Sequence, residues 1–147
     1  MKLSTKGRYG TRALLDLAIH QADEPVLLKD IARRQQISLP YLEQLMAPLR
    51  AGGLIRSSRG IRGGISLAKP APEITLCEVI CLLEGPTAPA ECVSNPAVCS
   101  RSEFCVTRDI WAELKTAIDG VLEATTLSDL VKRQQQKEST KQPAYCI

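Results

Sequence analysis

The chain places three cysteines, Cys92, Cys99 and Cys105, in one short stretch that lacks the features of a packed core. The residues between them are mostly polar, are interrupted by Pro96 and include few apolar side chains. Cysteine ordinarily behaves as a small buried hydrophobe, so three in such a segment indicate thiolates gathered around a ligand. Soft thiolates select zinc, copper(I) or iron–sulfur clusters.

Structural zinc and disulfides are the alternatives for this segment. The gaps of six and five residues between the cysteines lack the Cys-x-x-Cys pairs typical of structural zinc sites. The basic N-terminus has no apolar segment behind it, so it is not a secretory signal. We therefore expect a cytoplasmic protein with reduced cysteines, in which metal binding outranks disulfides. No run of about eighteen apolar residues predicts a membrane span.

Other candidate ligands are less favoured. Cys77 and Cys81 are one helical turn apart and could face one metal ion, but the apolar run around Cys81 favours a core position for both. His20 ends a predicted helix, where it is favoured as a partner of the helix dipole. Cys146 lies near the end of the chain and is interpreted as an incidental exposed thiol.

The two halves of the chain carry opposite charge, which the net charge of +3 conceals. Residues 1–69 hold twelve Lys and Arg against five Asp and Glu, whereas residues 70–147 hold seven against eleven. A basic half is the electrostatic footprint of a phosphate-binding surface, because neutralised phosphates release condensed counterions. A merely solvated basic face has the same composition, so the predicted elements must decide between the two.

The elements that position these residues are predicted to be mainly helical. Apolar residues at spacings of three and four predict helices over residues 6–21, 28–36, 38–51, 76–83, 106–124 and 127–135. Alternating patterns predict strands at residues 54–58 and 65–68, joined by the Gly-rich loop 59–64. Residues 136–147 are polar and predict a loose tail.

Two short helices with a tight connection, followed by a basic strand–loop–strand, predict a winged helix-turn-helix. The expected fold class is mainly α with a small β-wing, as a winged helix-turn-helix domain plus a long dimerisation helix. The apolar stripe of helix 106–124 is too long for so small a domain to cover, so we expect a homodimer. The expected divisions are a DNA-binding domain (1–70), a connecting helix and cysteine loop (71–105), a dimerisation helix with a short C-terminal helix (106–135) and a flexible tail (136–147).

The expected partner is double-stranded DNA with a pseudo-palindromic operator. The second helix of the pair is expected to read base edges in the major groove with Leu39, Tyr41, Glu43 and Gln44. The wing arginines expected to enter a narrow minor groove are Arg59 and Arg62. The basic side chains expected to contact phosphates are Lys6, Arg8, Arg12, Lys29 and Arg33.

Several stretches resemble the Rrf family of bacterial winged-helix transcription regulators, which includes the IscR, NsrR and CymR types. They are residues 1–10, 38–45 and 59–64, the Leu83-Glu84-Gly85 motif, the three cysteines, Trp111 and residues 126–130. The resemblance covers about residues 1–131. It implies that Cys92, Cys99 and Cys105 hold an iron–sulfur cluster, for which we favour [2Fe–2S] over [4Fe–4S]. It also implies that Glu43 and Arg59 read DNA.

The chain departs from the iron–sulfur regulators of this family in two places. Its first cysteine gap has six residues where theirs has five, and Arg108 stands where they have a histidine ligand. Arginine stays protonated and cannot coordinate iron. The fourth ligand is therefore left open among Glu91, Glu103, Cys146, water or a small thiol, and a side chain from the first helix of a second copy.

We expect a homodimeric DNA-binding transcription regulator that senses iron–sulfur cluster, iron, redox or nitric-oxide status through the three cysteines. The alternative is a cofactor-free repressor of the cysteine-metabolism type, regulated by a protein partner or by thiol oxidation. An enzyme is not expected. A thiol oxidoreductase that used Cys77 and Cys81 would lack both a close Cys-x-x-Cys pair and an evident general base.

Overall fold

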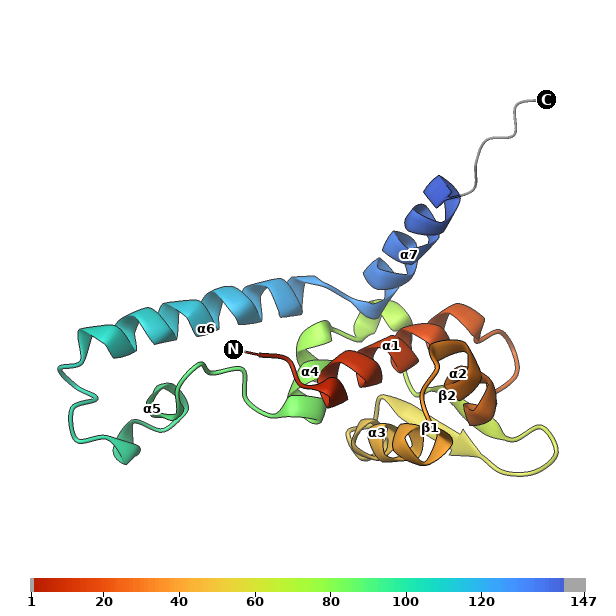
Figure 1. The fold of residues 1–147 in the computed structure, drawn as a ribbon, viewed down its shortest axis with the longest axis horizontal. Coiled ribbons are helices and arrows are strands. Elements are labelled where there is room, and N and C mark those ends of the chain that lie inside the picture. Colours follow the sequence, from red (N-terminus) through yellow and green to blue (C-terminus); the bar gives the residue numbers. More distant parts are fainter. Residues whose placement is uncertain (1, 142–147) are drawn as a thin grey trace.

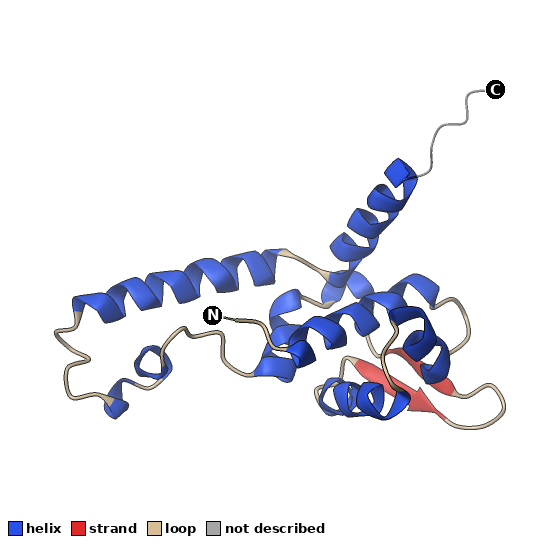
Figure 2. Cartoon of the chain, in the orientation of Figure 1, coloured by secondary structure: helices blue, strands red, loops and turns tan. Residues whose placement is uncertain are grey.

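The computed structural model of the protein describes residues 2–141, so the interpretation of Cys146 lies outside the described residues. Three helices come first, α1 (Thr5–His20), α2 (Leu28–Gln35) and α3 (Leu39–Ala51), followed by the antiparallel strands β1 (Ile55–Ser58) and β2 (Gly64–Leu67). The chain continues through η1 (Ala71–Glu73), α4 (Leu76–Glu84), α5 (Glu91–Ser94), η2 (Pro96–Val98), α6 (Val106–Ala124) and α7 (Leu127–Lys141). Figure 2 shows how small the sheet is beside the helices.

The core lies where α1, α2, α3 and α4 pack together against the sheet. Apolar residues at spacings of three and four give each helix one buried face. The largest fully buried side chains of α1 and α3 are Leu14, Leu17, Leu42, Leu45, Met46 and Leu49. Burying a side chain of this size stabilises the fold by about 1.5–3 kcal/mol. These helices and the sheet form one continuous core that holds the predicted DNA-reading elements in place.

Helix α1 crosses α4 at close range because two of its glycines face that helix. A Cβ atom on Gly7 would collide with Oε1 of Glu84, and one on Gly10 would lie 2.6 Å from Cδ1 of Leu83. The Glu84 carboxylate accepts hydrogen bonds from the backbone N–H groups of Ser4 (3.0 Å) and Gly7 (2.9 Å). A carboxylate suits this position, because the first N–H groups of a helix lack helical partners. The end of α4 therefore holds the beginning of α1.

Helix α6 contacts α4 of the body but buries none of its own residues. Figure 1 shows α6 reaching from the body of the molecule to the cysteine segment at its far end. The chain returns beside the start of α4, where the N–H of Leu76 donates to the carbonyl of Thr125 (2.9 Å) and that of Leu127 to Ile74 (2.8 Å). Residues 85–126, here called the arm, therefore leave and rejoin the body at opposite ends of α4.

The predicted helices and strands are confirmed to within about two residues, with one exception at the C-terminal end. The last helix continues to Lys141, so the part of the predicted tail formed by residues 136–141 is helical. The mainly α class with a small β-wing is confirmed. Over residues 2–141, no helix combines the length and the apolar character needed to cross a bilayer.

Candidate functional site

The connection between α2 and α3 is as tight as a helix-turn-helix requires. Gln36 ends α2 with a φ of 55°, a left-handed conformation that is uncommon for residues other than glycine. Ile37 turns into the core, and Ser38 is the N-cap residue directly before α3. Because Pro40 lies in the first turn of α3, the N–H that it lacks costs no helical hydrogen bond.

Three of the four side chains predicted to read bases are exposed on α3. Leu39, Glu43 and Gln44 face solvent. Tyr41, the fourth, is half-buried rather than exposed. Its ring meets that of Tyr9 edge-on, with centroids 6.4 Å apart, and this contact holds the start of α3 against α1.

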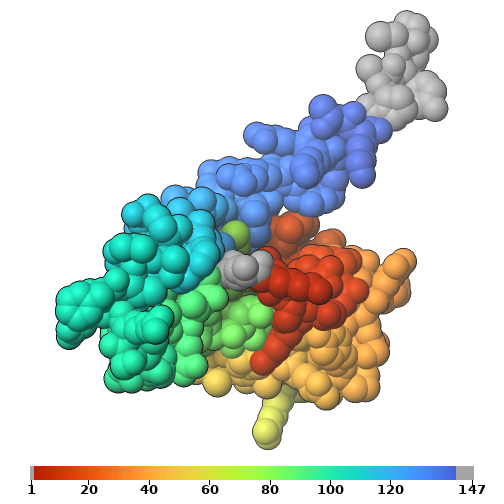
Figure 3. Space-filling model, turned by 60° about the vertical axis from the view of Figure 1, so that its left-hand side comes forward, coloured from red at the N-terminus to blue at the C-terminus, as the bar shows by residue number. Residues whose placement is uncertain are grey.

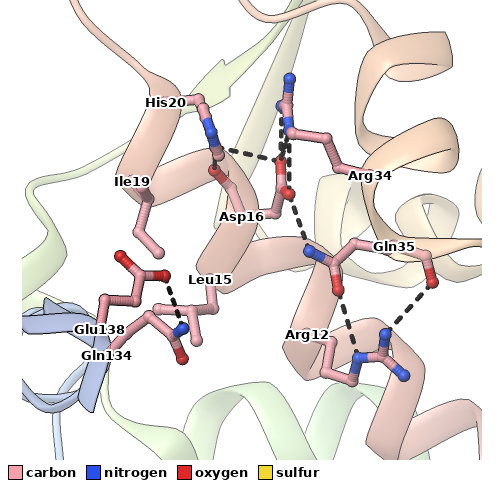
Figure 4. Close-up of a pocket in the computed structure, with 9 residues that line it drawn as sticks. All are labelled: Arg12, Leu15, Asp16, Ile19, His20, Arg34, Gln35, Gln134 and Glu138. Atoms are coloured by element: carbon pink, nitrogen blue, oxygen red, sulfur yellow. Dashed lines mark hydrogen bonds and ion pairs between the residues drawn. The ribbon is translucent and has the colours of Figure 1, made fainter. Parts of the chain in front are cut away.

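A buried carboxylate, Asp16 of α1, fixes the end of α2 (Figure 4). It accepts hydrogen bonds from Arg34 (2.6 Å) and from Nε2 of Gln35 (2.8 Å). This hydrogen bond from Arg34 raises the pKa of the guanidinium group. Arg12 in turn donates to Gln35 (3.2 Å), and His20 at the end of α1 lies 2.8 Å from the Asp16 carbonyl. Two arginines, Arg12 and Arg34, line this hollow of about 500 Å³, and both already donate hydrogen bonds within the protein.

The wing between β1 and β2 projects from the body as a narrow ridge (Figure 3). Arg59 and Arg62 are both exposed on it, but Arg62 also pairs with Glu24 at 3.2 Å. Between them Ile61 is fully exposed, and sequence reasoning did not single it out. An isoleucine at a loop tip beside two arginines is the signal that could have identified it. Gly60 takes a φ of 105°, a backbone conformation that favours glycine at this position.

The basic side chains predicted to contact phosphates all lie on the surface. They are Lys6, Arg8, Arg12, Lys29 and Arg33. Arg8 and Arg12 flank the ring of Tyr9, with guanidinium carbons 6.0 and 5.3 Å from its centroid. Arg33 pairs with Asp30 at 3.5 Å, where both side chains are open to solvent. The structure gives these cations the exposure that phosphate contact requires, and the contact itself stays a prediction.

The three cysteines of the arm share one irregular segment. Cys92 lies in α5, Cys99 directly follows η2, and Cys105 immediately precedes α6. The hydroxyl of Ser102 lies 2.7 Å from the Pro96 carbonyl and 2.9 Å from that of Cys99, which folds the segment back on itself. Within residues 2–141, no three His, Cys, Asp or Glu side chains lie close enough together to hold a metal ion. The thiols are therefore on one segment but are not gathered around a point.

The donor chemistry of this segment nevertheless fits a thiolate-bound group. The pKa of Cys105 is lowered, chiefly because the Thr107 hydroxyl lies 3.1 Å from its Sγ and then because the Arg108 N–H is close. A lower pKa favours the thiolate, which is the form that binds metals. Arg108 donates from Nε to the Cys92 carbonyl at 2.9 Å. It thereby joins α5 to α6.

The core position predicted for both thiols of α4 is wrong. Cys81 is exposed and Cys77 is half-buried. Helix α4 buries Val79, Ile80 and Leu83 instead. The apolar run around Cys81 was misleading because only one face of this short helix meets the core.

Comparisons with known proteins show the family and the fold of the chain. Residues 3–133 match the model of the family Rrf2, described as an iron-dependent transcriptional regulator. The chain is 46% identical over 132 residues to the protein rrf2 of Nitratidesulfovibrio vulgaris, covering 90% of this chain and 88% of that protein. The solved structure of CymR, the global cysteine regulator of B. subtilis, gives a TM-score of 0.75 at 38% identity, covering 90% of this chain and 98% of that one. IscR of T. potens gives a TM-score of 0.76 at 41% identity, covering 93% and 90%.

Proposed function

Because the chain belongs to the Rrf2 family of transcriptional regulators, we propose that it is a homodimeric DNA-binding regulator whose arm holds an iron–sulfur cluster. Membership confirms the winged-helix fold and shows a transcription regulator rather than an enzyme. The observation that carries the proposal is the position of Cys92, Cys99 and Cys105. They lie on the segment that links α4, which packs on α1 and α3, to the uncovered helix α6.

A second copy of the chain is the proposed cover of α6. Leu114 and Val121 are 44% and 67% exposed, although both belong to the apolar face of the helix. Together with Ala117, Ile118 and Leu122 they line an open groove of about 390 Å³. The residues Ile110, Leu114, Ala117 and Val121 follow each other at spacings of four, three and four, the pattern of helices that pair in a coiled coil. Two such arms would cover each other's grooves.

The proposed DNA contacts use both copies. Each α3 would present Glu43 and Gln44 to base edges in a major groove, while Arg59 would enter the adjacent minor groove. A pseudo-palindromic site requires the two α3 helices to lie about 34 Å apart, one turn of DNA. The arrangement of the two arms would set that spacing. The site of action follows from the ligand, since bacterial DNA lies in the cytoplasm.

Cys92, Cys99 and Cys105 would hold the cluster, and their segment must close around it because the thiols stand apart in this structure. When bound, such a cluster supplies one-electron redox chemistry and a sensitivity to oxidants. The chain's own part is to favour the thiolate of Cys105 through Thr107 and to move α5 together with α6 through Arg108.

A path from this segment to the DNA-binding surface runs through Glu84. The arm begins at Gly85, whose φ of 88° turns the chain sharply at the end of α4. The preceding residue, Glu84, caps α1, and α1 carries Lys6 and Arg8. Closure of the cysteine segment would therefore act on the start of α1. A difference of a few kcal/mol between two arrangements is enough to change DNA occupancy substantially.

The test is anaerobic purification followed by visible absorption and counts of iron and sulfide per chain. We expect a coloured protein that loses its visible absorption in Cys99→Ala while remaining dimeric. The matched control, Cys81→Ala, removes a thiol outside the arm and should keep the colour. Retention of iron in Cys99→Ala would show that the ligands are others.

The cofactor-free alternative is supported by two observations, the separated thiols and the likeness to CymR. In that case the air-protected protein would be colourless and would not take up iron and sulfide. It would still bind its operator, and oxidation of the thiols of the arm or a protein partner would change that binding.

A further inference from the structure

Two cysteines outside the arm form a pair that the proposed function does not use. Cys77 and Cys81 are four residues apart on α4, so their side chains are neighbours on one face of the helix. Neither is fully buried, and Cys81 is open to solvent. The pair therefore combines two soft donors with access from outside.

The surroundings of the pair come from α6. Lys115, Asp119 and Glu123 lie near enough for their charges and those of the two thiols to influence one another. Asp119 is already engaged, because it accepts hydrogen bonds from Lys115 and from the buried Thr87. Desolvation, followed by the neighbouring Cys81, raises the pKa of Cys77 to about 11. Cys77 thus keeps its proton at neutral pH and is a poor nucleophile.

The spacing of side chains on a helix distinguishes two reactions of such a pair, disulfide formation and metal binding. Side chains four residues apart on a helix have Cβ atoms about 5–6 Å apart. A disulfide needs Cβ atoms about 3.8 Å apart, so oxidation would require α4 to unwind locally. A metal ion between two sulfurs at about 2.3 Å from each would span at most about 4.6 Å from sulfur to sulfur. Thiols on Cβ atoms at helical spacing reach that separation without unwinding the helix.

The number of donors then selects the ion. Zinc in proteins is almost always held by four ligands, and the described residues contain no cluster of even three His, Cys, Asp or Glu side chains suited to a metal. Soft monovalent ions such as Cu(I) accept two thiolates in a linear arrangement and prefer sulfur to oxygen. We propose that Cys77 and Cys81 form a two-coordinate site for a soft monovalent cation of the Cu(I) type. The ion keeps its oxidation state, two S–H bonds break, and both protons pass to solvent as two metal–sulfur bonds form.

The Cys77–Cys81 site does not depend on the proposed cluster, and the experiment distinguishes copper bound at this site from metal bound by the cysteines of the arm. The full chain is prepared with the other four cysteines, Cys92, Cys99, Cys105 and Cys146, replaced by Ser, and circular dichroism checks its fold. Cu(I) is added without oxygen against a chromophoric Cu(I) chelator. We expect one equivalent of copper retained per chain, and more of it at higher pH because binding releases protons.

Removal of either thiol should abolish the site. Adding Cys77→Ser or Cys81→Ser to this background should lose the retained equivalent, whereas Thr116→Ser on α6 should keep it. The same two single substitutions in the otherwise unchanged, cluster-free chain should each lower the copper count by one. Retention of no copper with both thiols present, equal retention without them, or equally tight binding of zinc would overturn the proposal.

Discussion

The body of the protein and its arm differ in how far their helices bury their apolar side chains. In the body, leucines at helical spacing on α1 and α3 are wholly buried against their neighbours. In the arm, α6 has the same spacing of apolar residues and buries none of them. An amphipathic pattern therefore shows that a helix needs a covering surface, but not whether its own chain provides one. The body is complete by itself, and in our proposal a second copy completes the arm.

Charge on the apolar face of α6 should break the dimer and leave the body intact. Leu114→Asp with Val121→Asp would place unpaired charges in the interface, at a cost of about 3–5 kcal/mol each. We expect a monomer by analytical ultracentrifugation with an unchanged helical circular dichroism spectrum. Thr116→Asp adds the same charge to another face of α6 and should remain dimeric. A double variant that stays dimeric would refute α6 as the interface.

Truncation in the body should cost far more stability than truncation in the arm. In the monomeric double variant, Leu42→Ala should lower the free energy of unfolding by about 2–5 kcal/mol, because it leaves a cavity in a closed core. Ile110→Ala on α6, which is half exposed, should lower it by less than about 0.5 kcal/mol. Urea unfolding measures both. Equal losses would show that α6 packs on its own body in solution.

Binding of DNA should depend on basic residues of the body and not on those of the arm. Arg59→Ala should weaken binding to a specific site, selected from random DNA, by about 1–3 kcal/mol. Arg101→Ala removes an equally exposed arginine from the cysteine segment and should change little. Fluorescence anisotropy at fixed salt concentration measures the affinities. Unchanged affinity in Arg59→Ala would remove the wing from the DNA interface.

The two regions should also differ in thiol chemistry. Because the pKa of Cys105 is lowered and that of Cys77 is raised to about 11, Cys105 should be alkylated by iodoacetamide at a much lower pH. Thr107→Val removes the hydroxyl that favours the thiolate, so the alkylation profile of Cys105 should move to higher pH. Thr107→Ser keeps the hydroxyl and should not shift it. Mass spectrometry of the cluster-free chain follows each site, and an unmoved profile in Thr107→Val would contradict this assignment.

Elements bounded by strong local signals could be predicted from the sequence. Helix α3 ends where Gly52 and Gly53 follow it, and α6 runs over the predicted residues because its apolar side chains recur at helical spacing. The wing follows from alternating strands around glycines. The end of α7 was missed because polar residues at its C-terminus give no hydrophobic period, although they are helical.

The side chains that join elements distant in sequence could not be predicted with the same certainty. Asp16 lies among the buried residues Ala13, Leu14 and Leu17, and a carboxylate in an apolar face signals a buried partner without identifying Arg34. Gly7 and Gly10 signal a close helix crossing, but only the structure shows that Glu84 caps α1 there. The separation of the three arm thiols likewise depends on local turns that no spacing rule determines.

The attachment of the arm at both ends of α4 makes it interchangeable. The first residue of the arm follows Glu84, and its last residue, Thr126, forms an antiparallel bridge with Thr75. Insertions, deletions or new ligands within the arm therefore leave the register of the body unchanged. In the function proposed above, mutation could thus replace one sensing arm by another while the DNA-binding body keeps its fold. A fold built this way allows one ancestral scaffold to diversify into regulators that respond to unrelated chemical cues.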